Sequence, residues 1–280
     1  MRDEFSVAVA CATLGVSRSG YYRWQEPSES KRGREDRELA LRIREIFHHR
    51  RRRYGARRIA VELTDRGHPC GVDRVARLLK TQGLAAIQPK SFRPKTTDSR
   101  HTLGYNPNLL LARAEPKRID ELWVGDITYV PLRHGKFLYL ALLMDRYSRK
   151  IVGWKLSDDM TESLVLAALS QAIRNRQPSP GLICHSDRGG QYAGSRYRAL
   201  LRRVGILQSM SRAGDCYDNA FMESCFGTIK TELEMTDYKD SYEGRREIKS
   251  YIAYYNNQRR HSSLNYLTPL DFEARPQPRK

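Results

Sequence analysis

From residue 119 onward the chain alternates between short apolar, β-branched or aromatic runs and longer stretches of helical periodicity. Runs of this kind, bounded by turn residues, predict strands at 122–130, 137–144 and 151–156. Only short turns separate these three strands, so we expect them to form an antiparallel meander. The continuously apolar run at 137–144 indicates a central strand that is buried on both faces.

Helical patterns separate the two strands that are predicted next. A helix is expected near 161–175, and a short apolar run then leads to Asp187. A second helix near 195–204 precedes a strand near 206–209. The sequence therefore predicts an α/β domain at 119–235, in which helices flank a mixed five-stranded sheet.

Residues 35–86 have helical periodicity throughout and predict a small all-α domain of helix-turn-helix type. Three apolar faces begin at Leu39, Ile59 and Val72, and glycines separate the helices. Basic side chains lie off the third apolar stripe and in the run at 50–53, where they are suited to contact the phosphates or the major groove of DNA. That run also fits a solvated charge block, the usual role of such runs. The predicted DNA contacts of this domain are Arg51, Arg52, Arg74, Arg77 and Lys80.

The segments before and after this helical domain have weaker patterns. Residues 1–34 are predicted to be an N-terminal helical segment, a truncated helix-turn-helix with Ser17 as an N-cap. A packing or coupling segment is the equally weighted alternative. Residues 87–118 mix prolines with basic side chains and predict an extended linker that lies along DNA and is mobile without it.

The last part of the chain, residues 236–280, predicts a helix and tail that pack on the core. Ile248, Tyr251, Ile252 and Tyr255 recur at helical spacing and are expected on the buried stripe. The basic pair that follows this stripe suits phosphate contact. The predicted DNA contacts here are Arg259 and Arg260.

Composition and charge favour a polyanionic partner. The chain has 50 Lys and Arg against 32 Asp and Glu, a formal net charge of +18. No apolar run approaches the roughly 20 residues that a membrane span needs. The apolar run at 5–15 follows Asp3 and Glu4 and has no small-residue cleavage site, so we predict no secretion. Five cysteines without a Cys-x-x-C pair fit reduced thiols in the cytoplasm.

Three carboxylates have surroundings that suggest chemistry. Asp126 lies inside a predicted strand, where an ionised acid is costly to bury without a cation or donors. Asp187 ends another strand just before Arg188 and two glycines, which predicts an open strand end. Glu223 lies on a predicted helix, and Lys230 follows it by two turns on the same face. The inward stripe of that helix is predicted to contain Phe221, Cys225, Thr228 and Ile229.

Two acids from strands and one from a helix can converge on a pair of divalent ions. Two Mg²⁺ ions about 3.5–4 Å apart promote phosphodiester displacement. Mg²⁺ takes oxygen ligands and keeps several waters, so a few carboxylates suffice, and Mn²⁺ is expected to substitute. We predict Asp126 as the bridging ligand, Asp187 and Glu223 as one-sided ligands, and Lys230 as a phosphate contact. The alternative is an unrelated strand acid, turn acid and solvated helix acid.

Other side chains compete for these roles. Asp145 is a rival ligand at the end of the second strand, although Arg146 and Arg149 follow and are able to neutralise it. Asp215 and Asp218 are expected to cap the helix of the third acid. Three auxiliary candidates fit either a role in the site or ordinary packing and capping: Asn219, His185 and Gln191.

The residues around the three carboxylates resemble the catalytic blocks of insertion-sequence transposases. The matching segments are 123–129 (WVGDITY), 185–192 (HSDRGGQY) and 215–230 (DCYDNAFMESCFGTIK). They are similar to the second-reading-frame (OrfB) type, whose core resembles retroviral integrases. The resemblance runs from about residue 50 to residue 271. It implies an RNase H-like fold and an acid–acid–35–acid metal site that consists here of Asp126, Asp187 and Glu223.

The resemblance also implies a function. The expected enzyme is a DNA transposase that cleaves and joins strands at the ends of a mobile element and integrates the element into target DNA. Water and then a 3′-hydroxyl would attack the phosphodiester in line, without a covalent protein–DNA intermediate. A circular intermediate, a first-reading-frame partner protein, a homo-multimer on DNA and a bacterial, nucleoid-associated location are implied too. The alternatives are an RNase H-like nuclease or resolvase that hydrolyses without joining, and a non-catalytic DNA-binding regulator.

Overall fold

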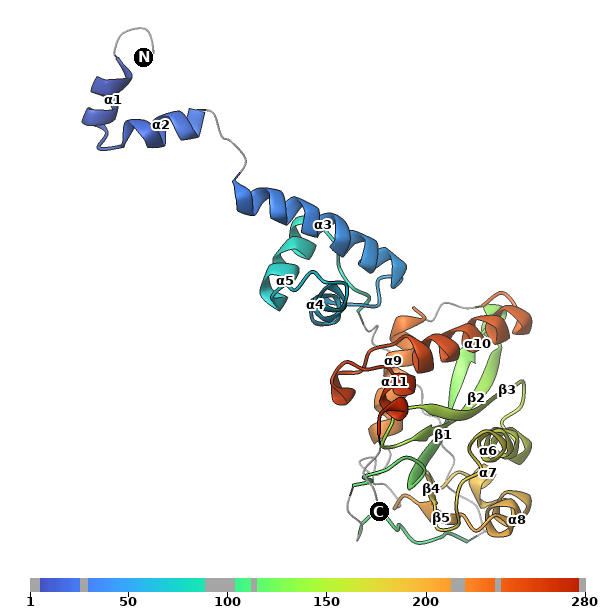
Figure 1. The fold of residues 1–280 in the computed structure, drawn as a ribbon. Helices are drawn as coiled ribbons and strands as arrows, with labels where there is room; N and C mark the ends of the chain where they lie inside the picture. Colours follow the sequence, from blue (N-terminus) through green and yellow to red (C-terminus); the bar gives the residue numbers. More distant parts are fainter. Residues whose placement is uncertain are drawn as a thin grey trace. The chain divides into compact units, whose positions relative to one another are not determined.

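The computed structural model describes residues 6–25, 30–88, 104–111, 115–212, 220–234 and 238–276. The chain folds into two compact units, residues 1–86 and 87–280 (Figure 1). In the described parts of the chain, no helix is both long enough and apolar enough to cross a membrane. The described cysteines are free thiols: Cys11, Cys70, Cys184 and Cys225.

The first unit is helical. Its helices are α1 (Val7–Thr13), α2 (Arg18–Gln25), α3 (Lys31–His49), α4 (Ala56–Asp65) and α5 (Val72–Thr81). The predicted cap of α2 is confirmed, because the Gly20 N–H donates to Ser17 Oγ at 3.0 Å. The three predicted apolar faces meet in one core between α3, α4 and α5. Its fully buried side chains include Ile43, Ile46, Tyr54, Ile59, Leu63 and Val75.

The second unit is built on a mixed sheet of strand order β3-β2-β1-β4-β5. β2 pairs antiparallel with β1 and β3, as the short turns predicted, and β4 pairs parallel with β1 and β5. This order and these directions confirm the predicted RNase H-like sheet. The strands are β1 (Leu122–Pro131), β2 (Phe137–Asp145), β3 (Ile151–Ser157), β4 (Ile183–Ser186) and β5 (Leu207–Met210), with η1 (Arg133–Gly135) between β1 and β2.

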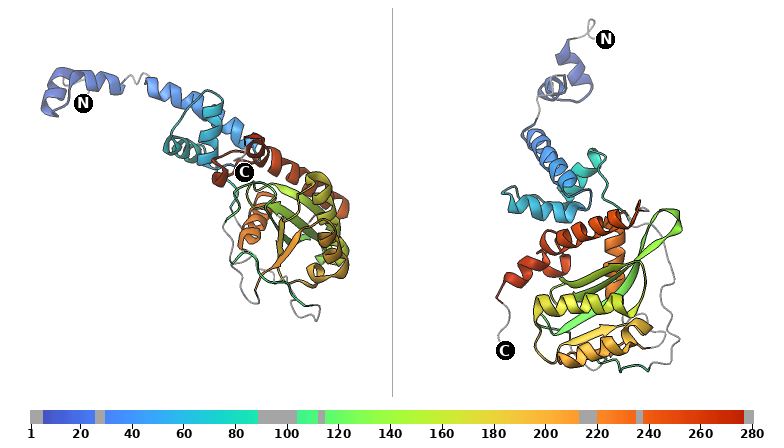
Figure 2. Two further views of the ribbon diagram at one scale, coloured as in Figure 1. Left: turned by 60° about the horizontal axis from the view of Figure 1, so that its bottom comes forward. Right: turned by 90° about the vertical axis from the view of Figure 1, so that its right-hand side faces the viewer.

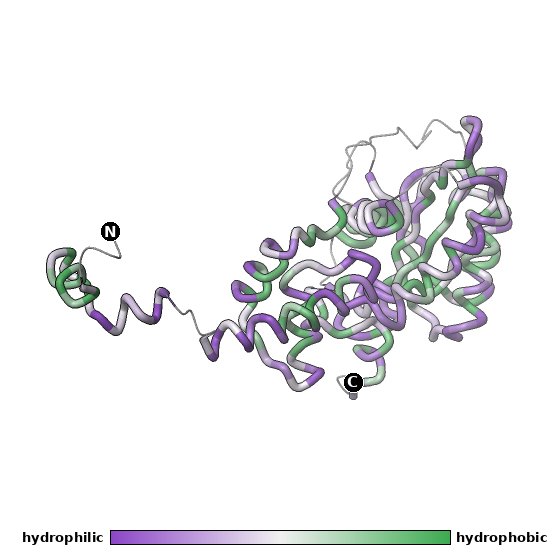
Figure 3. Tube along the Cα trace, turned by 90° about the horizontal axis from the view of Figure 1, so that it is seen from above, coloured by the Kyte–Doolittle hydropathy of each residue, from purple (hydrophilic) through white to green (hydrophobic). Residues whose placement is uncertain are grey.

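Helices cover both faces of this sheet (Figure 2). Side chains alternate along β1, so that Trp123 enters one core and Val124 the other. Hydrophobic stretches run along the strands, while polar and apolar residues alternate around the helices (Figure 3). One face packs against α6 (Glu162–Arg176), α7 (Gly190–Ala193) and α8 (Ser195–Arg203), the other against α9 (Ala220–Glu232) and α10 (Ser241–Asn257).

The predicted stripe of α10 is confirmed, because Ile248, Tyr251, Ile252 and Tyr255 are all buried. The stripe predicted for α9 is wrong in part. Its buried residues are Met222, Cys225, Phe226 and Ile229, while Phe221 and Thr228 lie at the edges of the packed face. Met222 and Phe226 are four residues apart and their bulk fixes the rotation of the helix. The chain then continues through η3 (Ser262–Leu264) to α11 (Pro269–Ala274).

Part of the predicted linker is bound to the sheet. Residues 104–111 lie beside β5, where the Leu109 N–H donates to Ser209 Oγ at 2.9 Å and the Met210 N–H donates to the Pro107 carbonyl at 3.4 Å. Leu109 and Leu110 also pack against the core under α9. The expectation of a mobile linker is therefore wrong for 104–111. Residues 89–103 and 112–114 of the same predicted linker lie outside the described residues.

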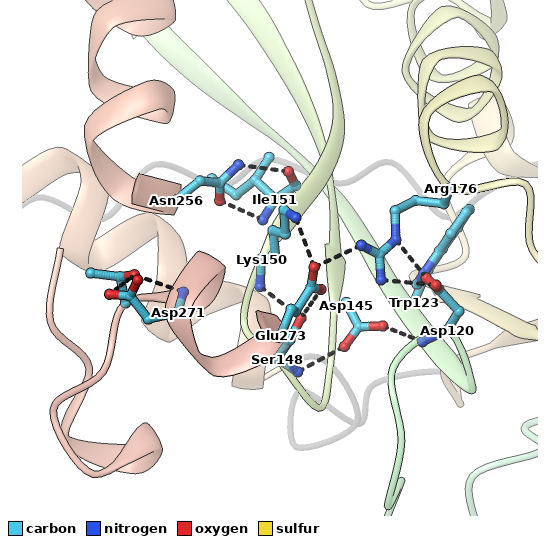
Figure 4. A network of polar contacts seen from close by, with 11 residues as sticks. Asp120, Trp123, Asp145, Ser148, Lys150, Ile151, Arg176, Asn256, Asp271 and Glu273 are labelled. Atoms are coloured by element: carbon cyan, nitrogen blue, oxygen red, sulfur yellow. Dashed lines mark hydrogen bonds and ion pairs between the residues drawn. The ribbon is translucent and has the colours of Figure 1, made fainter. Parts of the chain in front are cut away.

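A polar network fixes α11 to the sheet (Figure 4). Lys150 Nζ and Arg176 Nη1 donate to Glu273 Oε2 at 2.7 and 2.8 Å. Ser148 Oγ donates to Glu273 Oε1 at 2.8 Å, and Arg176 Nε donates to Asp120 at 2.9 Å. The Glu273 side chain is only 9% exposed. One carboxylate on α11 thus joins the β2–β3 turn to the end of α6.

Glu273→Gln is predicted to lower the free energy of unfolding at pH 7 by about 2–3 kcal/mol, because two cations lose a largely buried carboxylate. Burial alone would raise the pKa of Glu273, but hydrogen bonds from Lys150 and Arg176 hold it below its ordinary value of 4.5. The unfolded chain therefore binds the proton first, so this stabilisation is present above the ordinary pKa. It is lost as the pH falls through the lower folded-state pKa. Urea unfolding of the unaltered protein and of Glu273→Gln, at pH values above and below the ordinary pKa of 4.5, measures the difference in their free energies of unfolding.

The matched control is Glu115→Gln. The Glu115 side chain is 74% exposed and pairs with Arg146 at 3.0 Å. Its replacement should change the free energy of unfolding by less than about 0.5 kcal/mol at every pH. Equal losses in the two variants would contradict the anchoring role of Glu273.

Candidate active site

Asp126 and Asp187 lie on neighbouring parallel strands. Val124 of β1 is the partner of His185 of β4 in this register. Asp126 and Asp187 each come two residues later, just beyond the paired stretch, so both lie at the same end of these two strands. Residues two apart share a face of a sheet, and this face is the one that α9 covers. The fold thus brings the first two predicted acids together.

Two glycines adapt the backbone around these acids. A Cβ at Gly125 would lie 2.9 Å from Leu143 Cδ2, so glycine leaves room for the Leu143 side chain of β2 beside Asp126. Asp187 directly follows the last residue of β4, as predicted, and its Oδ1 accepts the Gly189 N–H at 3.0 Å. A Cβ at Gly189 would lie 3.1 Å from that same oxygen. The turn after β4 is therefore built around the Asp187 carboxylate.

Tyr192 of α7 lies in the core on the α6 side of the sheet. Its side chain is buried, and burial raises the pKa of its hydroxyl well above the ordinary value. The negative charges of Asp126 and Asp187 raise that pKa further. The phenol accordingly stays neutral and keeps its proton to donate.

Glu223 and Lys230 lie on one edge of α9, and seven residues span about 10.5 Å along a helix axis. Burial lowers the pKa of half-buried Lys230, whereas the charge of Asp126 raises it, so the ammonium group is near Asp126. Glu223 is exposed at the start of the helix. Among the residues that the structure describes, no three His, Cys, Asp or Glu side chains converge enough to hold a metal ion. Asp126, Asp187 and Glu223 therefore do not form one metal-binding group in this conformation.

Sequence reasoning missed the contact that holds the first turn of α9. The guanidinium carbons of Arg146 and Arg149 lie 4.3 and 4.0 Å from the centre of the Phe221 ring. Burial lowers the pKa of Arg149 to about 10, and the neighbouring charge of Arg146 lowers it too. An aromatic residue two positions before Glu223, together with two arginines in a strand turn, was the only signal of this contact in the sequence.

Asp145, the rival metal ligand, has a structural role. It is fully buried and accepts backbone N–H groups from Asp120, Tyr147 and Ser148 at 2.7, 3.0 and 2.7 Å. Burial raises the pKa of Asp145, and these hydrogen bonds act in the opposite direction. The carboxylate therefore closes the β2–β3 turn. The predicted capping residues Asp215 and Asp218 lie outside the described residues.

The auxiliary candidates have different surroundings. His185 is fully buried, with Nδ1 at 2.8 Å from Ser209 Oγ and Nε2 at 3.2 Å from Ser211 Oγ. Gln191 donates to the Met160 carbonyl at 3.1 Å. Asn219 lies outside the described residues. His185 thus shapes the strand that leads to the second aspartate.

Comparison with known proteins identifies the family. Models of the integrase core domain match residues 116–216 and 204–269, and a model of an HTH-like domain matches residues 34–92. The chain is 42% identical to the 31 kDa protein of insertion element IS600 from Shigella sonnei, over 95% of this chain and 97% of that protein. It is 38% identical to transposase InsF for insertion sequence IS3A from Escherichia coli, over 96% of this chain and 94% of that protein. The chain belongs to the insertion-sequence transposases.

Solved integrases resemble this transposase more distantly. The integrase catalytic core of HTLV-2 in complex with magnesium has a TM-score of 0.45 and 16% identity, and covers 55% of this chain and 96% of its own. An intasome of simian T-cell lymphotropic virus in complex with a PP2A regulatory subunit has a TM-score of 0.49 and 15% identity. It covers 79% of this chain and 74% of its own.

The basic residues predicted to contact DNA in the first unit of the transposase fall into two groups. Arg74 and Arg77 of α5 pair with Asp36 of α3 at 2.7 and 2.6 Å. The hydrogen bond from Arg77, which has the larger effect, and the hydrogen bond from Arg74 lower the pKa of the Asp36 carboxyl group. The two arginines thus already hold α3 and α5 together. The other three predicted contacts, Arg51, Arg52 and Lys80, are exposed, and Arg77 is also exposed although it pairs with Asp36.

Arg259 of the transposase is buried, contrary to its predicted exposure to DNA. Its Nε donates to Glu232 Oε1 at 2.9 Å, and Tyr251 Oη donates to Glu232 Oε2 at 3.0 Å. The pair joins the last turn of α9 to the chain after α10. Arg260 is half buried and donates to the Tyr266 carbonyl at 3.2 Å. Glu232 lies 27 residues from Arg259, so no local pattern indicated this partner.

Arg259→Ala is predicted to lower the free energy of unfolding of the transposase by about 3–5 kcal/mol, because Glu232 is left buried without its cation. Arg246→Ala is the matched control, since the Arg246 side chain is 61% exposed and pairs with its neighbour Glu247 at 3.3 Å. The control should lose less than about 0.5 kcal/mol. Urea unfolding measures both, and equal stability of the two variants would contradict a structural role for Arg259.

Proposed function

We propose that this transposase cleaves DNA at the ends of its mobile element and joins the cut strands to new positions, with Asp126, Asp187 and Glu223 as its catalytic carboxylates. The observation that supports the proposal most strongly is the register of β1 and β4, in which Asp126 and Asp187 each follow a paired residue by two positions at the same end of these strands. Two adjacent carboxylates are costly unless cations compensate them. Such a pair suits divalent metal ions better than a role in packing.

The donor set fits Mg²⁺, which prefers carboxylate oxygens and retains several waters. Asp126 and Asp187 would hold the ions, and Glu223 would add a third carboxylate from the first turn of α9. When bound, two such ions activate the attacking oxygen and stabilise the leaving oxygen of a phosphodiester. Mn²⁺ has the same ligand preference and is proposed to substitute for Mg²⁺.

The protein's own side chains position the substrate. Lys230 lies near Asp126 and is proposed to bind the phosphate next to the bond that breaks, where its ammonium group offsets the two aspartates. Water attacks first to free a 3′-hydroxyl, and that hydroxyl then attacks the second phosphodiester in line. No covalent bond to the protein forms.

DNA of the element ends and of the target is the proposed substrate, in keeping with the net charge of +18. A first-reading-frame partner protein and a homo-multimer on paired ends follow from the family resemblance and stay predictions. Exposed Arg51, Arg52 and Lys80 are the proposed contacts of the first unit with DNA, and half-buried Arg260 is a proposed contact of the second. To contact DNA, Arg74 and Arg77 would have to release Asp36 and bind a phosphate group instead.

Asp126→Asn, Asp187→Asn and Glu223→Gln are each predicted to lower strand joining by at least about a hundredfold, because each removes a charged oxygen ligand. The assay uses a pre-cut end oligonucleotide and compares Mg²⁺, Mn²⁺ and Ca²⁺. Asp159→Asn, at an exposed acid of the same unit, is the matched control and should join normally. Intact joining in any of the three variants would refute the assignment of that residue. Hydrolysis without joining by the unaltered protein would favour a nuclease.

Lys230→Ala is predicted to weaken binding of end DNA about five- to tenfold in about 50 mM salt, because one phosphate contact near the aspartates is lost. Its affinity for Mn²⁺ should stay within about twofold, since lysine donates no metal ligand. Lys249→Ala, an exposed lysine of α10, is the control. Fluorescence anisotropy measures DNA binding, and an unchanged affinity would reject the phosphate role of Lys230.

A further inference from the structure

Residues 104–111, here called the strap, hold the outer edge of the sheet at several points. The Asn106 side chain donates to Gln208 Oε1 at 2.5 Å, and Arg198 of α8 donates to the Gly104 carbonyl at 2.6 Å. The backbone of the strap also bonds to β5 at Ser209 and Met210. Leu109 and Leu110 of the strap pack into the core on the α9 side. The strap therefore passes from α8, across the edge strand, to the face with the aspartate pair.

The residues on either side of Asp187 are fastened to the end of β5. His185, two residues before it, contacts the hydroxyl groups of Ser209 and Ser211. Arg188, one residue after it, donates from Nε to the Ser211 carbonyl at 2.7 Å. The Ser211 N–H in turn donates to the Ser186 carbonyl at 2.9 Å. The residues before and after Asp187 are thus both held by contacts with β5 and Ser211.

The strap contacts residues on both sides of Asp187. The Leu109 N–H donates to the same Ser209 hydroxyl that contacts His185, at 2.9 Å. The Arg188 guanidinium lies 4.6 Å from the centre of the Tyr105 ring, within the range of cation–π attraction. Two independent contacts therefore connect the strap to the residues that precede and follow Asp187.

We propose that the strap positions the Asp187 carboxylate, and that Tyr105 and Arg188 are positioning residues for strand transfer. The inference rests on the proposed catalytic role of Asp187. With the strap in place, Arg188 is held between the Tyr105 ring and the Ser211 carbonyl, and the turn over Asp187–Gly189 keeps one conformation. Without it, Arg188 loses its aromatic support and the turn gains freedom. Small displacements of a catalytic group reduce rate steeply, so the loss should appear in turnover.

The test substitutes Tyr105, which is 40% exposed and so replaceable without opening a core. Tyr105→Ala is expected to lower the rate of strand joining about five- to tenfold with little change in KM for end DNA. Tyr105→Phe keeps the ring and should restore the rate to within about twofold of the unaltered protein. Tyr242→Ala is the matched control, because Tyr242 is an exposed tyrosine on α10, and it should join normally.

Hydrogen exchange provides a readout that does not depend on metal or turnover. The amides of Ser211 and Gly189, which bond to the Ser186 carbonyl and to Asp187 Oδ1, should exchange about tenfold faster in Tyr105→Ala. Arg188→Lys keeps the charge but loses the planar Nε donor, and should speed exchange at the same two amides. Amides of β2 should be unaffected in every variant. These measurements use the full chain.

The outcomes separate the two proposals. If Asp187→Asn abolishes joining but Tyr105→Ala matches Tyr242→Ala in both rate and exchange, the strap has no positioning role. If Tyr105→Ala speeds exchange without slowing joining, the strap orders the turn but does not position a catalytic group, and the inference also fails. If Asp187→Asn joins normally, Asp187 is not a catalytic carboxylate, and the positioning role that rests on it falls with that assignment.

Discussion

The parallel pairing of β1 with β4 is the constraint on which the rest of the catalytic unit depends. Its register puts Asp126 and Asp187 two residues beyond the paired Val124 and His185, at one end of the two strands. Two ionised carboxylates that approach one another repel unless nearby positive charge compensates them. Lys230 of α9 is half buried, and the charge of Asp126 raises its pKa. Its positive charge therefore offsets part of this cost. The pair is thus built to attract more positive charge than the protein alone supplies.

The helix that brings Lys230 to this pair is anchored at both ends, by different interactions. Two arginines of the β2–β3 turn flank the Phe221 ring at its start. A buried ion pair between Glu232 and Arg259 fixes its end to the chain after α10. Neither anchor involves a predicted metal ligand. The position of Glu223 relative to the aspartates therefore depends on packing at the first turn of α9, where a cation–π contact is weaker than the ion pair at the other end.

Periodicity and local composition predicted most of the fold, and the catalytic motifs predicted where the acids lie along the chain. The strands, α6, α8 and the stripe of α10 were all visible in this way, because each depends on residues close in sequence. Two of the errors share one cause. Arg259 reads as a surface cation until Glu232, 27 residues away, is known to lie beside it. The stretch at 104–111 reads as part of a free linker because its partner, β5, lies about 100 residues later.

The strap shows why one segment can act on both the edge of the sheet and the catalytic acid. An uncovered edge strand exposes unpaired backbone groups and invites pairing with other chains, so covering β5 is useful in itself. The sheet order leaves only β5 between that edge and β4, which ends at Asp187. His185 and Ser209 pair directly across those two strands. Whatever covers this edge is therefore only one strand away from Asp187, the proposed catalytic carboxylate.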